Sequence, residues 1–181
     1  MTELDPITLR RELMLRNAIE ARLDRLVSLA TSAALKLSPR TQMEESQLRN
    51  LLNAALESRS VEVTTNFIRY QIARKERDWD TSLNGFGHTI IQHIVKSLKT
   101  TADDIVSDLG NDSTDADRAW FQSKNSDIHV RLMHLYLGYV NRVFYFYKKS
   151  IDRERRDPDA VKDALISLKL VTALEEAKAD A

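Results

Sequence analysis

Turn-forming residues are scarce in this chain, and their scarcity limits the folds it can adopt. Its 181 residues include 4 Gly and 3 Pro, whereas an average chain of this length would contain about 13 Gly and about 9 Pro. Hairpins, sandwiches and Rossmann-type folds need these residues at their turns. Apolar residues recur instead at helical spacing over long stretches, as at Leu23, Leu26 and Ala30. The pattern predicts an all-α protein.

Capping residues, prolines and breaks in the apolar pattern mark where the helices begin and end. We predict a long first helix from Asp5-Pro6 to Ser38-Pro39, and a second helix opened by a capping box of Thr41 and Glu44. A third runs from Ser60 toward Arg77, and a fourth from about Ile90 to Gly110, which is its C-terminal glycine. Thr114 with Asp117 opens a short fifth helix.

The segment from about residue 127 to 156, capped by Ser126 or Asp127, carries apolar or aromatic side chains around most of a helix circumference. Such a helix is buried on most sides. We therefore predict a single helical domain, residues 1–181, with about six or seven helices in a bundle around this central helix. A last amphipathic helix follows Asp157-Pro158, and the tail from about residue 175 is expected to fray.

Composition also excludes several classes of protein. The chain has no Cys, which rules out disulfide bonds, thiolate metal sites and cysteine nucleophiles. The acidic N-terminus lacks the basic and apolar regions of a signal peptide. No apolar stretch reaches the length of about 18 residues that is needed to span a membrane. We expect a soluble, cytoplasmic protein with no membrane partner.

The charges balance overall but are unevenly distributed. Lys and Arg total 27, as do Asp and Glu. Basic residues predominate between Arg59 and Arg77 and again between Arg131 and Arg156, while seven Asp lie between Thr100 and Asp127. One stripe of the central helix gathers polar residues within about a quarter-turn: Arg131, His134, Gly138, Asn141, Arg142, Tyr145 and Lys149.

This stripe has the chemistry of a nucleic-acid contact. Arg and Lys at such spacing can neutralise successive phosphates, and His134 or Tyr145 can stack on a base. Gly138 costs about 0.5–1 kcal/mol relative to Ala in a helix, which the close approach of another backbone, a partner helix or a nucleic-acid strand would explain. The solvated face of a core helix would show the same charges.

Nothing in the sequence indicates catalysis. The four His form two pairs, His88 with His93 and His129 with His134, whose members lie about 140° apart on a helix. There is no His-Glu-x-x-His motif, phosphate-binding glycine loop or nucleophile elbow. The Asp103–Asp117 stretch lacks calcium-loop spacing and is typical of a solvated surface or one that meets a basic partner. We predict no enzyme activity, metal or cofactor.

The segment from Thr41 to Trp79 carries a family resemblance. Ser46-Gln47-Leu48-Arg49 opens a leucine-rich helix, and Asn66 to Arg74 supplies an aromatic, basic helix after it. The combination resembles the small helical subunits of type III CRISPR RNA-guided effector complexes, which act in antiviral defence. The resemblance implies a non-catalytic ribonucleoprotein subunit that packs against other effector subunits and further copies of itself. Its RNA partner would be the guide–target duplex or a single strand.

The resemblance implies RNA binding by Arg49, which matches the motif best, and by Arg69 and Arg74, which match it less closely. The polar stripe points independently to Arg131, Arg142, Tyr145 and Lys149. Two other functions stay open at this stage. One is a protein-only helical scaffold or adaptor that docks a partner helix along the Gly138 stripe. The other is a helical transcription regulator, which the long first helix disfavours because it contains no helix-turn-helix turn.

Overall fold

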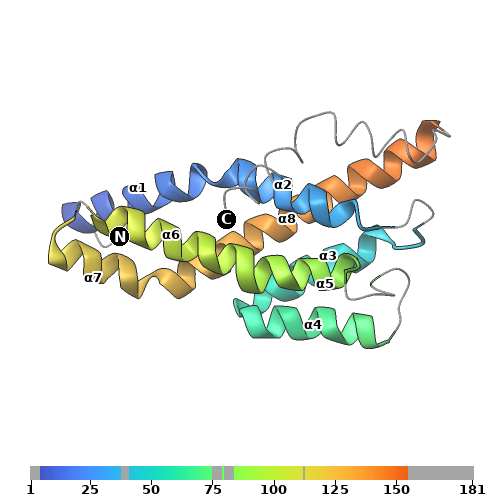
Figure 1. Cartoon of the computed structure of the whole chain (residues 1–181), viewed down its shortest axis with the longest axis horizontal. Helices are drawn as coiled ribbons and strands as arrows, with labels where there is room; N and C mark the ends of the chain where they lie inside the picture. The colour runs from blue at the N-terminus through green and yellow to red at the C-terminus, as the bar shows by residue number, and fades with distance from the viewer. Residues whose placement is uncertain (1–4, 38–40, 75–78, 80–83, 112, 155–181) are drawn as a thin grey trace.

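The computed structural model describes residues 5–37, 41–74, 79, 84–111 and 113–154, with side chains to residue 149. All regular structure in these ranges is helical, which confirms the all-α prediction (Figure 1). The predicted last helix, the fraying tail and the helix end near Arg77 lie outside the described residues. The helices are α1 (Pro6–Glu20), α2 (Leu23–Ala34), α3 (Glu45–Ser58), α4 (Val61–Ala73), α5 (Phe86–Gln92), the π-helix η1 (His93–Ser97), α6 (Leu98–Asn111), α7 (Asp115–Ser123) and α8 (Asn125–Glu154).

The first helix is not continuous, contrary to the prediction. Arg22 leaves helical geometry with φ −105° and ψ 0°, and its N–H donates to Ile19 rather than to the residue four positions back. The break separates two halves that pack on different neighbours, since α1 contacts α6 and α7 whereas α2 packs on α8. The Arg22 guanidinium donates to Asp108 of α6 over 2.6 Å. Local apolar periodicity runs through such a bend unchanged.

Several predicted caps are confirmed, and one is displaced. Ser60 accepts from the Val63 N–H at 3.3 Å at the start of α4, and Thr114 accepts from the Asp117 N–H at 3.2 Å at the start of α7. The capping box of α3 is formed by Glu44 with Gln47 rather than by Thr41 with Glu44. Its reciprocal contact is the Glu44 N–H donating to Gln47 Oε1 over 2.9 Å.

The helix predicted from Ile90 to Leu109 is continuous but begins earlier and contains a π-turn. α5, η1 and α6 follow one another without a break from Phe86 to Asn111. Gly110 lies inside α6 and does not have the positive φ of a C-terminal glycine, so that prediction is wrong. Gly110 is instead covered by Arg118, whose Cγ would lie 3.3 Å from an added Cβ.

The long helix α8 forms the centre of the bundle, as predicted. α2, α3, α6 and α7 pack against it, and it contributes the buried residues Ile128, Leu132, Met133, Tyr136, Leu137, Val140, Phe144 and Tyr147. It begins at Asn125, slightly before the expected cap. Its apolar surface is not uniformly buried, since 51% of Phe146 and 48% of Tyr145 are exposed. α8 therefore has an open side near its C-terminal half.

Candidate nucleic-acid interface

The open side of α8 lies beside α3. Lys149 Nζ approaches Glu45 Oε1 at 3.4 Å at one end, and His134 Nε2 donates to the Ala55 carbonyl over 3.0 Å at the other. These two contacts show that α3 and α8 run antiparallel along this side. Residues 131 to 149 of α8 span about 27 Å at a rise of 1.5 Å per residue. The face is long enough to follow several nucleotides of a strand.

The predicted stripe residues of α8 share this face. Arg131 and Arg142 are exposed, and the Arg142 guanidinium lies 5.5 Å from the Tyr139 ring centroid. The Lys149 ammonium lies 5.6 Å from the Tyr145 ring. Stacking of this kind orders long cationic side chains while it leaves their polar atoms accessible. The structure thus groups cations with half-exposed aromatic rings, which are the two side-chain types that RNA surfaces use.

Arg49 joins the same face from α3. It is exposed and follows Glu45 by four residues, so both lie on one side of α3. Because Glu45 contacts Lys149, the structure brings Arg49 toward the C-terminal half of α8. Lys148 has a different role, since its ammonium donates to the Met43 carbonyl over 2.6 Å and thereby holds the chain that precedes α3.

Arg69 and Arg74 lie apart from these residues. Arg69 is exposed on α4 and Arg74 is exposed just after its last residue, and α4 packs on α3, α5 and η1. Arg69 lies 3.8 Å from Glu62 on its own helix. Arg74 donates to the Tyr70 hydroxyl over 3.3 Å and stacks on the Tyr70 ring at 5.3 Å. The structure therefore does not bring Arg69 and Arg74 into the α8 face.

Gly138 leaves a gap in the middle of the face. A Cβ built on it would meet no atom within 4 Å apart from its chain neighbours and the backbone of its own helix. The close approach that the sequence predicted is therefore not made by the described part of this chain. The gap lies one turn after His134 and one turn before Arg142, so it falls between Arg131 and Arg142 along the face.

His93, His129 and His134 form hydrogen bonds inside the bundle. His129 Nε2 donates to the Ile94 carbonyl over 2.7 Å, within the π-turn η1. His93 Nδ1 lies 2.9 Å from the Tyr136 hydroxyl, and complete burial raises the Tyr136 pKa well above its usual value. His134 binds the end of α3, as described above. Among the described residues no group of three or more His, Asp or Glu is placed to hold a metal.

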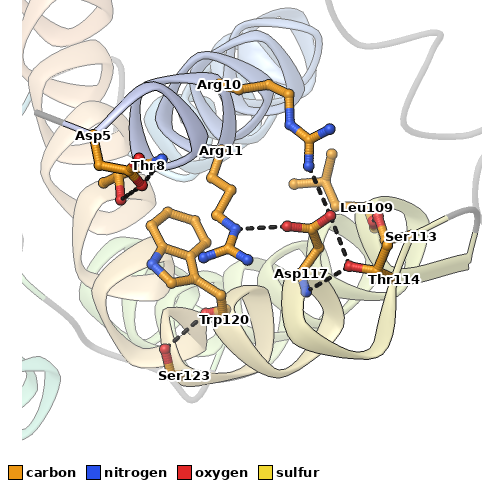
Figure 2. A network of polar contacts seen from close by, with 10 residues as sticks. All are labelled: Asp5, Thr8, Arg10, Arg11, Leu109, Ser113, Thr114, Asp117, Trp120 and Ser123. Atoms are coloured by element: carbon orange, nitrogen blue, oxygen red, sulfur yellow. Dashed lines mark hydrogen bonds and ion pairs between the residues drawn. The ribbon is translucent and has the colours of Figure 1, made fainter.

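The Asp-rich segment is largely neutralised from within. Asp117 accepts from Arg11 Nε at 2.6 Å and from Arg10 Nη2 at 2.7 Å, and Thr114 Oγ1 donates to it over 3.0 Å (Figure 2). Hydrogen bonding from Arg11 is the main cause that lowers the Asp117 pKa. Trp120 packs beside this network, 5.8 Å from the Arg11 guanidinium. Local sequence patterns could not predict the Arg10 and Arg11 contacts, because these join residues more than a hundred positions apart.

Three further carboxylates of this segment are paired, and one of them, Asp115, accepts from Arg118 of its own helix over 2.8 Å. Asp108 binds Arg22, and Asp103 accepts from Lys99 and, over 2.8 Å, from Asn125. The Lys99 hydrogen bond is the main cause that lowers the Asp103 pKa. The α6 and α7 carboxylates therefore serve to attach α1, α2 and α8 to the bundle. Asp103, Asp104, Asp108 and Asp115 remain exposed, so this part of the segment is a solvated surface even where its carboxylates are paired.

Comparisons with known proteins assign the chain to no family. No protein-family model matches the chain, and no curated protein or solved structure is detectably similar to it. None of the described helices has the length and apolar character needed to cross a membrane.

Proposed function

We propose that this chain is a non-catalytic RNA-binding subunit of a CRISPR-type RNA-guided ribonucleoprotein complex. One observation carries the proposal, namely the grouping of Arg131, Arg142 and Lys149 with an exposed Tyr145 along one side of α8. Arg49 extends this surface on α3. The sequence Ser46-Gln47-Leu48-Arg49, on which the family resemblance rests, lies in the first turns of that helix.

The face suits a phosphate backbone better than a specific base sequence. Its cations are spread over about 27 Å of one helix, so they can contact separate phosphates along a single strand or one side of a duplex. The gap at Gly138 admits a strand close to the helix backbone. In an RNA-guided complex, base pairing supplies sequence specificity and protein subunits supply backbone contacts of this kind.

The test compares RNA binding by two triple variants of the full chain. One replaces Arg131, Arg142 and Lys149 with Ala, and the control replaces Arg16, Arg25 and Lys96, which are exposed on α1, α2 and η1. Fluorescence anisotropy with labelled single-stranded RNA and with an RNA duplex measures affinity at about 50 mM salt. We expect the face variant to bind about tenfold to a hundredfold more weakly, and the control to stay within about threefold of the wild type.

Equal losses in the two variants would show a non-specific charge effect and contradict the proposal. Unfolding of the face variant, seen by circular dichroism, would show that these cations are structural.

A protein-only scaffold is the second candidate, favoured by Leu9 and Leu13. These residues lie one turn apart on α1 and are each 57% exposed. Replacement of both with Gln should leave RNA affinity unchanged under our proposal. If RNA does not bind at low salt and the substitutions abolish self-association in sedimentation velocity, the scaffold function is favoured instead.

A further inference from the structure

A pocket of about 240 Å³ lies where α1, the end of α3 and the first half of α8 meet. Its apolar wall includes Leu15, Ile19 and Ile128, all of them buried. Its polar wall carries the cations Arg59, Lys124 and Arg131, the imidazole of His134, and the carboxylates of Glu12 and Asp127. The pocket thus combines an apolar side with a set of converging charges, most of them cationic.

The end of α3 holds two of these side chains in place. The Ala55 carbonyl accepts from the Arg59 N–H at 3.2 Å and from His134 Nε2 at 3.0 Å. Arg59 adopts φ 46° and ψ 32°, and it is the one residue with positive φ in the described part of the chain. Glycine is the usual residue at such a helix end, because a side chain is strained there. An Arg at this position keeps its cation at the pocket at a conformational cost.

The cations of the pocket are incompletely neutralised. Lys124 lies 3.9 Å from Asp127 and 5.4 Å from the Trp120 ring. Neither Arg59 nor Arg131 has a side-chain hydrogen bond or ion pair with another described residue. Three cations against two carboxylates leave one net positive charge. The pocket therefore favours an anionic group that also carries hydrogen-bond donors for Glu12 and Asp127.

From this arrangement we propose that the pocket binds one nucleotide. Its phosphate pairs with Arg59 and Arg131, because guanidinium groups bind phosphate through paired donors. Its base lies against the apolar wall, and its ribose hydroxyls or amino group donate to Glu12 or Asp127. The assignment rests on the proposed function in one respect: Arg131 also belongs to the α8 face, so the nucleotide is one unit of the RNA strand that the face binds.

Isothermal titration of the full chain with AMP, adenosine and inorganic phosphate tests the pocket without any RNA strand. We expect AMP to bind more tightly than adenosine or phosphate, since only AMP fills both walls. Arg59→Gly should weaken AMP binding by about tenfold or more, because a charge-assisted contact is lost. Its melting midpoint should not fall below that of the wild type, since Gly relieves the strained backbone. Arg25→Ala, exposed on α2 and outside both the pocket and the α8 face, is the control and should bind AMP normally.

Two results would overturn the proposal: no saturable AMP binding, or equal loss in Arg59→Gly and Arg25→Ala. If Arg59→Gly melts below the wild type, Arg131→Gln replaces it in the same titration, and normal AMP binding by that variant would also overturn the proposal. The outcome is independent of the RNA experiment. If the protein binds RNA but not AMP, only the nucleotide-pocket proposal is contradicted. If AMP binds in a way that depends on Arg59 but RNA does not bind, the proposed function is contradicted and the pocket is a site for free nucleotides.

Discussion

Substitutions at Gly138 test both the fold and the proposed function. One is expected to raise the stability of the protein, and another to lower its RNA affinity. Because an added Cβ meets no atom within 4 Å beyond its own helix, Gly138→Ala should remove the conformational cost of glycine in a helix without a steric penalty. The expected gain in the free energy of unfolding is about 0.5–1 kcal/mol. For a chain of this size the melting midpoint should rise by about 1–4 °C.

The same position should respond in the opposite direction when RNA binding is measured. Gly138→Leu would fill the gap between His134 and Arg142 and keep a strand away from the α8 backbone. We expect its affinity for single-stranded RNA to fall by about tenfold, a loss of about 1.4 kcal/mol, while its helical signal stays intact. Circular dichroism melts and anisotropy titrations on the wild type, Gly138→Ala and Gly138→Leu give both quantities.

Gly87 provides the matched control for the stability measurement. A Cβ at that position would lie 2.9 Å from the Trp79 carbonyl oxygen and 3.1 Å from Ile72 Cδ1. Gly87→Ala should therefore lose about 1–3 kcal/mol through overpacking. A lower melting midpoint for Gly138→Ala would refute the open packing of the α8 face. Wild-type RNA affinity in Gly138→Leu would refute the approach of a strand at the gap.

Other positions give further tests. Phe144→Ala should lower the free energy of unfolding, measured in urea, by about 3–5 kcal/mol because Phe144 is fully buried. Phe146 is 51% exposed, so Phe146→Ala should lower it by less than about 1 kcal/mol. Similar losses in the two variants would mean that α8 is wrongly oriented. Asp117 and Asp103 have lowered pKa values, so the stability they add is complete above their unfolded pKa of about 4 and is lost as the pH falls through the folded value. Acid titration of Asp117→Asn should accordingly show a weaker loss of stability below about pH 4 than the wild type, and an unchanged acid transition would argue against the Arg10 and Arg11 contacts. The double variant Arg69→Ala, Arg74→Ala should bind RNA within about threefold of the wild-type affinity, because α4 lies outside the α8 face. A loss as large as that of the α8 triple variant would show that the RNA-binding surface extends to α4. Glu45→Gln should strengthen RNA binding severalfold in anisotropy, since it frees Lys149 from a carboxylate at 3.4 Å, and weaker binding would contradict the role given to Lys149.

Most helix starts set by local sequence were predicted well, although the capping box of α3 lies three residues later than predicted. The N-caps Ser60 and Thr114 were placed correctly because a cap bonds a residue three positions away. The central position of α8 followed from the number of its apolar side chains. Phe146 shows the limit of that inference, since an apolar residue on a long helix has no local signal to tell whether another helix covers it.

Features set by tertiary contacts were predicted poorly. The break at Arg22 depends on α1 and α2 having different neighbours, and the cover over Gly110 depends on Arg118 of α7. The Asp117 network joins α1 to α7 across the length of the chain. In the candidate interface, the α8 residues were predicted together because one helix carries them. Arg59 was not among the predicted site residues, because the pocket forms only where three helices meet.

The salt dependence of RNA affinity tests the central claim most directly. Each phosphate contact with a single strand contributes about 0.7 to the slope of log affinity against log salt concentration. Anisotropy titrations between about 50 and 200 mM salt should therefore give the Arg131→Ala, Arg142→Ala, Lys149→Ala variant a slope shallower than the wild type by about 2. An unchanged slope in a folded variant would contradict the α8 face as the RNA-binding surface.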